Sequence, residues 1–345
     1  DELRCNLVQT VAMVGLLLTG WVEPPRDPGL NLSTLLQQIL STIAQHGGAT
    51  ATQLHRTLCG PGPFAQVDAG RFARLLRAAA ATDLISQAGD GTLLHGQAGE
   101  RIVNHYSFYT AFQTPAEWRL VADGRTLGTL PIAQPLLEDS FLIFAGRRWR
   151  ITSIDPEARI VELSRATGGV PPNFGGSAAL IDDRVRSEML QVYRDDDIPA
   201  WLDVRAATLL GEGRAAWQRL NLGNTVLVAA GTSTIVFPWS GDRSLLTASC
   251  LLRAAGVVAE VEGPSLMVAG TTPAQIADAA RALLSRPAPD PVVLARQLSN
   301  TELDKWDWVL DNDLAAEAAA ARLLDVDGAR RVLHAAATSA DPAGH

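Results

Sequence analysis

Hydrophobic spacing divides the chain into a helical N-terminal part, a strand-rich middle and a mixed C-terminal part. Residues 1–18 are mostly apolar and end before Gly20 and Pro24-Pro25, which predicts a buried helix. The apolar run is too short for a membrane span and lacks the basic start and cleavage site of a signal peptide. We expect residues 1–28 to form this helix and a linker. Because the sequence starts with Asp1, we also expect it to be cut from a longer protein.

Residues 29–112 carry a trihelical pattern followed by a hairpin. The helices are expected at 35–45, before Leu58 and at 71–81, with N-caps at Ser33, Thr50 and Asp68. Two short apolar runs then flank the turn Gly89-Asp90-Gly91, as in a β-hairpin. Three helices and a hairpin predict a winged helix.

Alternation of apolar and polar residues takes over in 113–180. It predicts a small β-barrel with strands at 117–122, 126–131, 140–145, 149–154 and 159–164. Residues 181–300 follow a β-β-α-β-β-α order, which indicates a mixed α/β unit on an antiparallel sheet, and 301–345 form a helical acidic tail. The predicted fold class is therefore α+β multidomain: a winged helix, a small β-barrel, and a mixed α/β unit with a helical tail.

Charge narrows the possible functions. The formal net charge of −8 argues against a free-standing, tight nucleic-acid binder, although a local basic patch is compatible with an acidic body. The three cysteines form no CxxC pair, so neither a zinc site nor a disulfide framework is expected, and a cytoplasmic location is predicted.

Several catalytic signatures are missing. The sole lysine, Lys305, lies outside any P-loop, and the chain has no GxGxxG, GxSxG or HExxH phrase. Asp195-Asp196-Asp197 is expected to be a solvated helix end rather than a metal site. We therefore expect no catalytic residue, no metal and no cofactor in this chain.

The most informative stretch for binding is Arg147-Arg148-Trp149-Arg150, at the entry to a predicted strand. In one interpretation the arginines contact phosphates and the indole stacks on a base. In the other, Trp149 is a core residue beside Ile151 and the arginines pair with nearby glutamates. The sequence leaves both interpretations open.

Two further sets of residues are candidates for nucleic-acid contact. Arg71 and Arg74, with Arg77, recur on the third helix, which is the recognition position of helix-turn-helix proteins, or they form an ordinary solvated face. After the hairpin, Arg101, His105 and Tyr106 line a strand path, or Tyr106 belongs instead to an aromatic cluster that seals the winged helix to the barrel. The other members of that cluster are Phe108, Tyr109 and Phe112.

Three phrases carry a resemblance to a known family. They are Gly20-Trp21-Val22-Glu23-Pro24-Pro25, then Gly99-Glu100-Arg101 with Phe108, then Ala145–Arg150 followed by Gly169, Pro172 and Phe174-Gly175-Gly176. Together they resemble the region after the motor in the large helicase-related (Lhr) family of superfamily 2 DEAD/DEAH-box helicases. The resemblance spans roughly residues 3–270.

The resemblance implies a winged helix and a β-barrel behind an ATP-dependent 3′-5′ motor that unwinds DNA or RNA:DNA hybrids. It also implies that Trp149 stacks on the tracking strand. The motor motifs are missing here, so ATP and Mg²⁺ are expected on motor domains elsewhere, in the same or a separate polypeptide. The expected partners are those motor domains and single-stranded or 3′-tailed DNA, with no membrane.

The expected function is thus a strand-guiding, nucleic-acid-binding module of such a helicase, in DNA repair or phage defence. One alternative is a protein-interaction scaffold in a repair or phage-defence complex, which the acidic charge favours. Another is an alkylpurine-type DNA glycosylase, because Gln66-Val67-Asp68 fits the QxD phrase of that class, although it also fits a loop with Asp68 as a helix cap.

Overall fold

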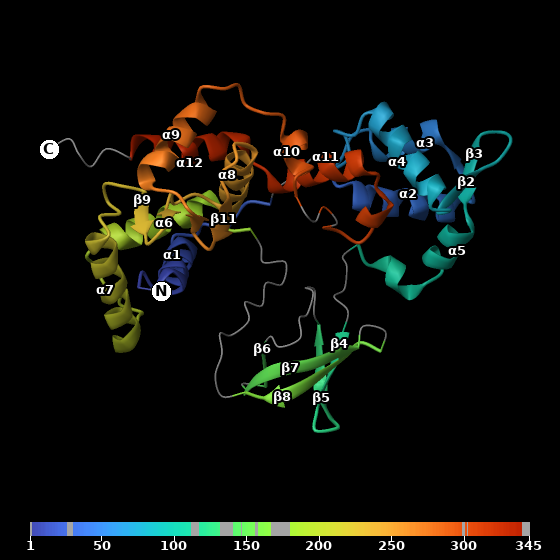
Figure 1. The fold of residues 1–345 in the computed structure, drawn as a ribbon. Coiled ribbons are helices and arrows are strands. Elements are labelled where there is room, and N and C mark those ends of the chain that lie inside the picture. Colours follow the sequence, from blue (N-terminus) through green and yellow to red (C-terminus); the bar gives the residue numbers. More distant parts are fainter. Residues whose placement is uncertain are drawn as a thin grey trace. The chain divides into compact units, whose positions relative to one another are not determined.

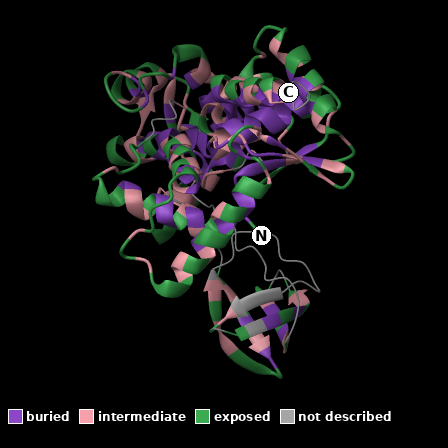
Figure 2. Cartoon of the chain, turned by 90° about the vertical axis from the view of Figure 1, so that its left-hand side faces the viewer, coloured by how far each residue is buried: buried purple, intermediate pink, exposed green. Residues whose placement is uncertain are grey.

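The chain forms an α+β protein that divides into two compact units. The computed structural model describes residues 2–25, 30–111, 117–131, 141–145, 147–155, 158–166, 180–298, 301 and 303–339. This described part contains twelve α-helices and three small sheets (Figure 1). Unit 1 comprises Asp1–Ala111 and Leu180–His345, and unit 2 comprises Phe112–Ala179. Buried residues, purple in Figure 2, line the inner sides of the helices of unit 1 and form a smaller group on the strands of unit 2.

The first part of unit 1 follows the predicted trihelical pattern. Its elements are α2 (Leu32–His46), β1 (Ala49–Thr50), α3 (Ala51–Leu58), α4 (Ala69–Ala81), β2 (Ile85–Gln87) and β3 (Thr92–His95). The three strands pair antiparallel in the order β1-β3-β2. Helix α3 begins with a capping box between Thr50 and Gln53, and the Asp68 carboxylate accepts the Arg71 N–H at the start of α4.

One predicted cap is wrong. Asn31, and not Ser33, caps α2, because the Asn31 side chain accepts the Thr34 N–H. The buried Ser33 hydroxyl instead accepts the backbone N–H of Trp306 at 3.0 Å. Ser33 therefore holds a distant segment of the chain against α2.

Helix α5 (Gln97–Val103) packs directly against the start of the hairpin. A Cβ on Gly99 would lie 2.0 Å from the Leu84 carbonyl oxygen, so only glycine allows this approach. The 3-10 helix η1 (Tyr106–Tyr109) follows, with Phe108 buried in the same core as α2 and α4. Gly99 of the Gly99-Glu100-Arg101 phrase thus has a packing role that positions η1.

The rest of unit 1 combines the N-terminal helix with the residues after 180. Helices α1 (Cys5–Leu18), α6 (Asp183–Arg194) and α7 (Val204–Arg219) share an aromatic core with Tyr193, Trp217 and Trp239. The antiparallel sheet β11-β12-β10-β9 carries helices on it. Its strands are β9 (Leu227–Ala230), β10 (Ser233–Val236), β11 (Ala259–Glu262) and β12 (Ser265–Val268).

The helices around this sheet include most of the expected tail. They are α8 (Asp242–Ala254), α9 (Pro273–Leu284), α10 (Pro291–Ala295), η2 (Asp307–Val309), α11 (Asn312–Leu323) and α12 (Val326–Thr338). Helix α12 packs on α8 and α9, while α11 contacts both α4 and α8. In the described part of the chain, no helix has the length and apolar character that crossing a membrane requires.

Unit 2 is one five-stranded sheet in the order β5-β4-β8-β7-β6. The strands are β4 (Glu117–Ala122), β5 (Arg125–Pro131), β6 (Phe141–Phe144), β7 (Arg147–Asp155) and β8 (Ile160–Arg165). All five strands match the prediction, but among the described residues the edge strands β5 and β6 do not pair, so the predicted barrel is not closed. The two edges meet through side chains instead: a Cβ on Gly128 of β5 would lie 2.7 Å from Phe144 Cζ of β6.

Candidate nucleic-acid interface

Trp149 lies in the interior of the unit 2 sheet. Its side chain is 6% exposed and packs with Leu120, Ile151, Val161 and Leu163. The indole Nε1–H donates to the Phe144 carbonyl oxygen at 3.3 Å, and the Arg165 guanidinium lies 5.9 Å from the ring centroid. In this structure the ring has no free face for a base, so the geometry corresponds to the core interpretation rather than to stacking.

The arginines beside Trp149 are on the surface. Arg147 and Arg150 are both exposed, but strand alternation puts Arg147 on the Trp149 face at the start of β7. Arg150 lies on the opposite face, the same face as Arg119 of β4. Arg148 lies in β7, but its side chain is outside the described residues, as are the Gly169–Gly176 phrase and Phe112. This outward face of the sheet therefore carries exposed guanidinium groups.

Charge is distributed unequally between the two units. Unit 2 contains seven arginines and seven acidic residues, so it is formally neutral, and unit 1 carries the whole net charge of −8. Unit 2 therefore repels a polyanion much less than unit 1 does.

Arg71 and Arg74 of α4 are both held by one carboxylate from α11. Arg71 Nε lies 2.5 Å from Glu317 Oε2, and Arg74 pairs with the other oxygen, Oε1. Burial would raise the pKa of Glu317, but its hydrogen bonds to Arg74 and Arg71 outweigh burial and lower that pKa. The two arginines thus join α4 to α11, and in this structure they are not presented to a groove of DNA. Arg77, one turn further along α4, is exposed.

The residues after the hairpin form a separate exposed group. Arg101 is exposed, with Nε donating to the Gln97 carbonyl oxygen at 3.3 Å. The His105 and Tyr106 rings lie 4.4 Å apart between centroids, and His105 Nδ1 caps η1 by accepting the Ser107 N–H. Tyr106 is 80% exposed and Tyr109 is 86% exposed. Phe108 is buried in the core of unit 1, whereas Tyr106 and Tyr109 are not.

The sequence pattern predicts Tyr109 only as a member of the sealing cluster, and it predicts no role for Glu317 or Lys305. The three-residue spacing of Tyr106 and Tyr109 indicates that both side chains lie on one side of a 3-10 helix, because residues i and i+3 of such a helix do so. The contacts of Glu317 and Lys305 join segments too far apart in sequence for any local pattern to show them.

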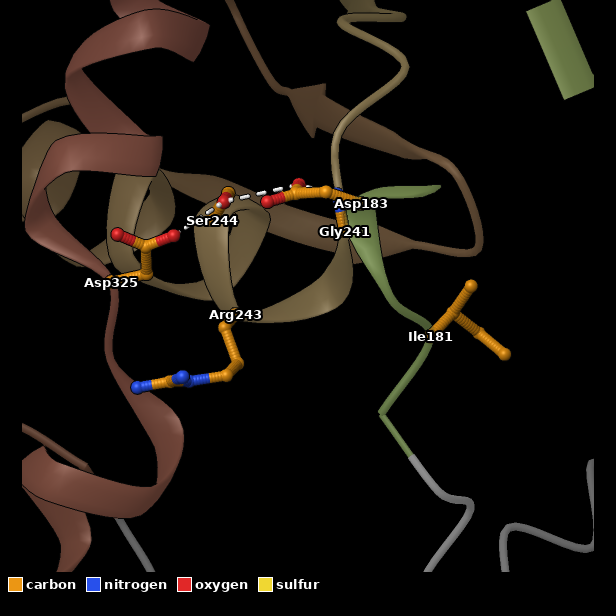
Figure 3. Close-up of a pocket in the computed structure, with 6 residues that line it drawn as sticks. All are labelled: Ile181, Asp183, Gly241, Arg243, Ser244 and Asp325. Atoms are coloured by element: carbon orange, nitrogen blue, oxygen red, sulfur yellow. Dashed lines mark hydrogen bonds between the residues drawn. The ribbon is translucent and has the colours of Figure 1, made fainter. Parts of the chain in front are cut away.

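A small polar cavity lies where the first turns of α6, α8 and α12 meet (Figure 3). Ser244 Oγ lies 3.2 Å from Asp325 Oδ2 and 3.4 Å from Asp183 Oδ1. Both carboxylates also accept backbone N–H groups, Asp183 from Gly241 and Asp325 from Gly328. No histidine lines the cavity to activate the serine hydroxyl, so we assign these residues to helix capping.

Two other chemical candidates have structural roles. Asp68 of the Gln66-Val67-Asp68 phrase caps α4 and pairs with Arg71, and Val67 is buried. Asp195 accepts the backbone N–H of Asp197 at 3.0 Å in an exposed turn. Within the described residues, no three histidine, cysteine or carboxylate side chains converge as a metal ion would require.

Comparisons with known proteins give no match: no family model, no curated protein and no solved structure is similar to this chain.

Proposed function

We propose that this chain is the nucleic-acid-binding, strand-guiding part of an ATP-dependent 3′-5′ helicase whose motor domains lie elsewhere. The resemblance of its three sequence phrases to the Lhr family supports the proposal. In the same proposal, residues 30–111 are a winged helix, because three helices precede the β2–β3 hairpin and β1 completes an antiparallel sheet. Unit 2 takes the place of the small barrel as an open, curved sheet.

The charge of unit 2 is the observation that carries the proposal. Its formal neutrality on an acidic protein and its exposed Arg150 and Arg119, which share one face of the sheet, provide a surface where a phosphate backbone can approach. Trp149 then supports β7 from the inner side of the sheet. Single-stranded or 3′-tailed DNA is the proposed ligand, and the location is cytoplasmic.

Helix α1 supports the proposed motor partner. It contains no charged residue, and its buried side faces α6 and α7. Met13, Leu17, Leu18 and the following Val22 are nevertheless exposed, at 47%, 64%, 68% and 73%. Such a contiguous apolar surface is a common feature of protein contacts, and it also favours the second candidate function, a protein-interaction scaffold.

Binding of a 3′-tailed duplex, measured by fluorescence anisotropy across a salt titration, tests the function. We expect salt-dependent binding by the wild-type chain. In the double variant Arg119→Ala/Arg150→Ala, the slope of log K against log salt should fall in magnitude by about 1.4, roughly 0.7 for each lost contact with a single strand. Arg194→Ala/Arg205→Ala, which removes two exposed arginines of unit 1, is the matched control and should keep the slope.

A folded wild-type chain that binds DNA at no salt concentration would reject the proposal and favour the scaffold. Equal slopes for the wild type and the Arg119/Arg150 variant would show that DNA binds elsewhere on the protein.

A further inference from the structure

Two tyrosines stand out from unit 1 on a single short turn. Tyr106 and Tyr109 are 80% and 86% exposed, and neither belongs to a hydrophobic core cluster of the described residues. They are three residues apart in η1, so their side chains lie on the same side of this 3-10 helix, about 6 Å apart along its axis. Phe108 points the other way, into the core, at 6% exposure.

The turn that carries the tyrosines is fixed by side chains from distant parts of the chain. Lys305 Nζ donates to the carbonyl oxygen of Ser107 and, at 2.7 Å, to that of Thr110. Gln37 Nε2 of α2 donates to the Phe108 carbonyl oxygen at 2.6 Å. The carbonyl oxygens of Ser107, Phe108 and Thr110 are therefore held by two distant side chains, those of Lys305 and Gln37. Lys305 is the sole lysine of the sequence.

This arrangement has no evident use in folding. Both tyrosine rings remain largely in water, with the His105 ring beside that of Tyr106, while the backbone beneath them is held in place by Lys305, Gln37 and the buried Phe108. A rigid support reduces the entropy lost when a ligand is bound, so exposed rings on a fixed turn are suited to recognition. Aromatic rings at a nucleic-acid surface stack on bases of any sequence.

The segment around the turn does not share the acidic excess of unit 1. Arg101, His105 and Lys305 lie on or against the segment 97–110, in which Glu100 is the one acidic residue. The tyrosine hydroxyls add no charge. Unit 1 is acidic as a whole, so this segment is an exception on its surface.

We infer that Tyr106 and Tyr109 form a stacking platform for unpaired bases of single-stranded nucleic acid, with Arg101 next to the path of the backbone. The inference rests on the proposed function and adds to it a second contact region, in unit 1, with Tyr109 as a new binding residue. Unit 2 contributes contacts to phosphates, and the platform contributes contacts to bases.

Anisotropy with a labelled oligothymidylate of about 20 nucleotides, longer than the site of a single-strand-binding domain, provides the test. Tyr106→Ala/Tyr109→Ala should bind roughly 5-fold to 150-fold more weakly for each stacked base lost, which corresponds to about 1–3 kcal/mol. The salt slope should stay at the wild-type value, because no phosphate contact is removed. This combination of lost affinity and retained slope separates the platform from the arginines of unit 2.

Tyr106→Phe/Tyr109→Phe keeps both rings and should bind like the wild type. Val204→Ala removes another side chain that is 86% exposed and is the control for a general surface effect. If the double alanine variant folds poorly, each single variant carries the same test.

The outcomes distinguish the two proposals. Wild-type binding with no loss in either alanine variant overturns the platform and leaves the proposed function standing. Equal losses in the alanine and phenylalanine variants overturn stacking, because only the hydroxyl groups would then matter. A folded wild-type chain that binds no oligonucleotide at low salt overturns both the platform and the proposed function.

Discussion

At the scale of single residues, Trp149 illustrates how burial changes an interpretation. Its indole fills the small core of unit 2, so Trp149→Ala should destabilise this sheet by about 3–5 kcal/mol, the usual range for truncating a buried aromatic residue. Hydrogen exchange of β7 and β8 amides, read by mass spectrometry, measures the loss locally. Amides of unit 1 should keep their protection.

The matched control is Arg165→Ala, which removes the guanidinium over the indole and leaves the ring in place. That contact is exposed and should contribute only about 0.5–1 kcal/mol. If the β7 and β8 amides of Trp149→Ala kept their wild-type protection from exchange, a core role for Trp149 would be contradicted. The interpretation of Trp149 as a surface residue would then be favoured.

At this scale, helix caps next to their helices in sequence could be predicted, and contacts between residues far apart in sequence could not. Thr50 and Asp68 were identified as caps because a cap and its helix are adjacent in sequence. The predicted cap at Ser33 is wrong because the helix begins two residues earlier, where Asn31 caps it. The Leu35 N–H then bonds the Asn31 carbonyl oxygen, and the Ser33 hydroxyl accepts the Trp306 N–H. Arg71 has the spacing of a recognition helix, but its partner Glu317 comes 246 residues later.

At the scale of elements, the packing of α5 depends on one glycine. Gly99→Ala would place a Cβ 2.0 Å from the Leu84 carbonyl oxygen, so α5 or the start of β2 must shift. We expect a loss of stability of about 1–3 kcal/mol. Chemical denaturation measures it, and reduced oligothymidylate binding should accompany it, because α5 leads into η1.

Gly15→Ala in α1 is the paired control. It lies within a helix, and its Cβ would meet nothing within 4 Å, so the substitution should stabilise the protein by about 0.4–1 kcal/mol. Opposite signs for the two substitutions are expected because only Gly99 lies against another backbone. A neutral Gly99→Ala would show that α5 can move away from the hairpin without cost.

The strands of unit 2 could be predicted from the sequence, but whether they close into a barrel could not. Alternation marks each strand, but closure depends on the stagger between strands and on the curvature of the sheet. Here β4 pairs parallel to β8, and a bulge between Leu120 and Val121 changes the register with β5. Phe144 then covers Gly128 at the point where the edges meet, so a side chain occupies the place of a backbone ladder.

At the scale of the whole molecule, α11 connects two cores of unit 1. Leu314 belongs to the core of α2–α4, whereas Ala316 and Ala319 belong to the core of α8, α9 and α12. In Figure 1, α11 lies between these two groups of helices. The Glu317 carboxylate adds a charged link from the same helix to α4, so the segment expected to be an acidic tail is an internal connector.

Glu317→Gln should therefore destabilise unit 1 near neutral pH, by about 1–2 kcal/mol, because charge-assisted hydrogen bonds to both Arg71 and Arg74 are weakened. Asp278→Asn, which breaks the exposed pair with Arg281, is the control and should change stability by less than about 0.5 kcal/mol.

The same ion pairs predict how this difference depends on pH. Hydrogen bonds from Arg74 and Arg71 lower the pKa of folded Glu317 despite its burial, so the carboxylate contributes stability that is fully present above its unfolded pKa of 4.5. That stability is lost as the pH falls through the lowered, folded pKa. The stability difference between the wild type and Glu317→Gln should consequently be constant from pH 7 to about pH 5 and shrink below it. Urea denaturation of both proteins over this range measures the difference. If the stability difference stayed constant down to the pH at which the protein unfolds in acid, the charge of Glu317 would not be what links α4 to α11. The packing of its side chain would then provide the link.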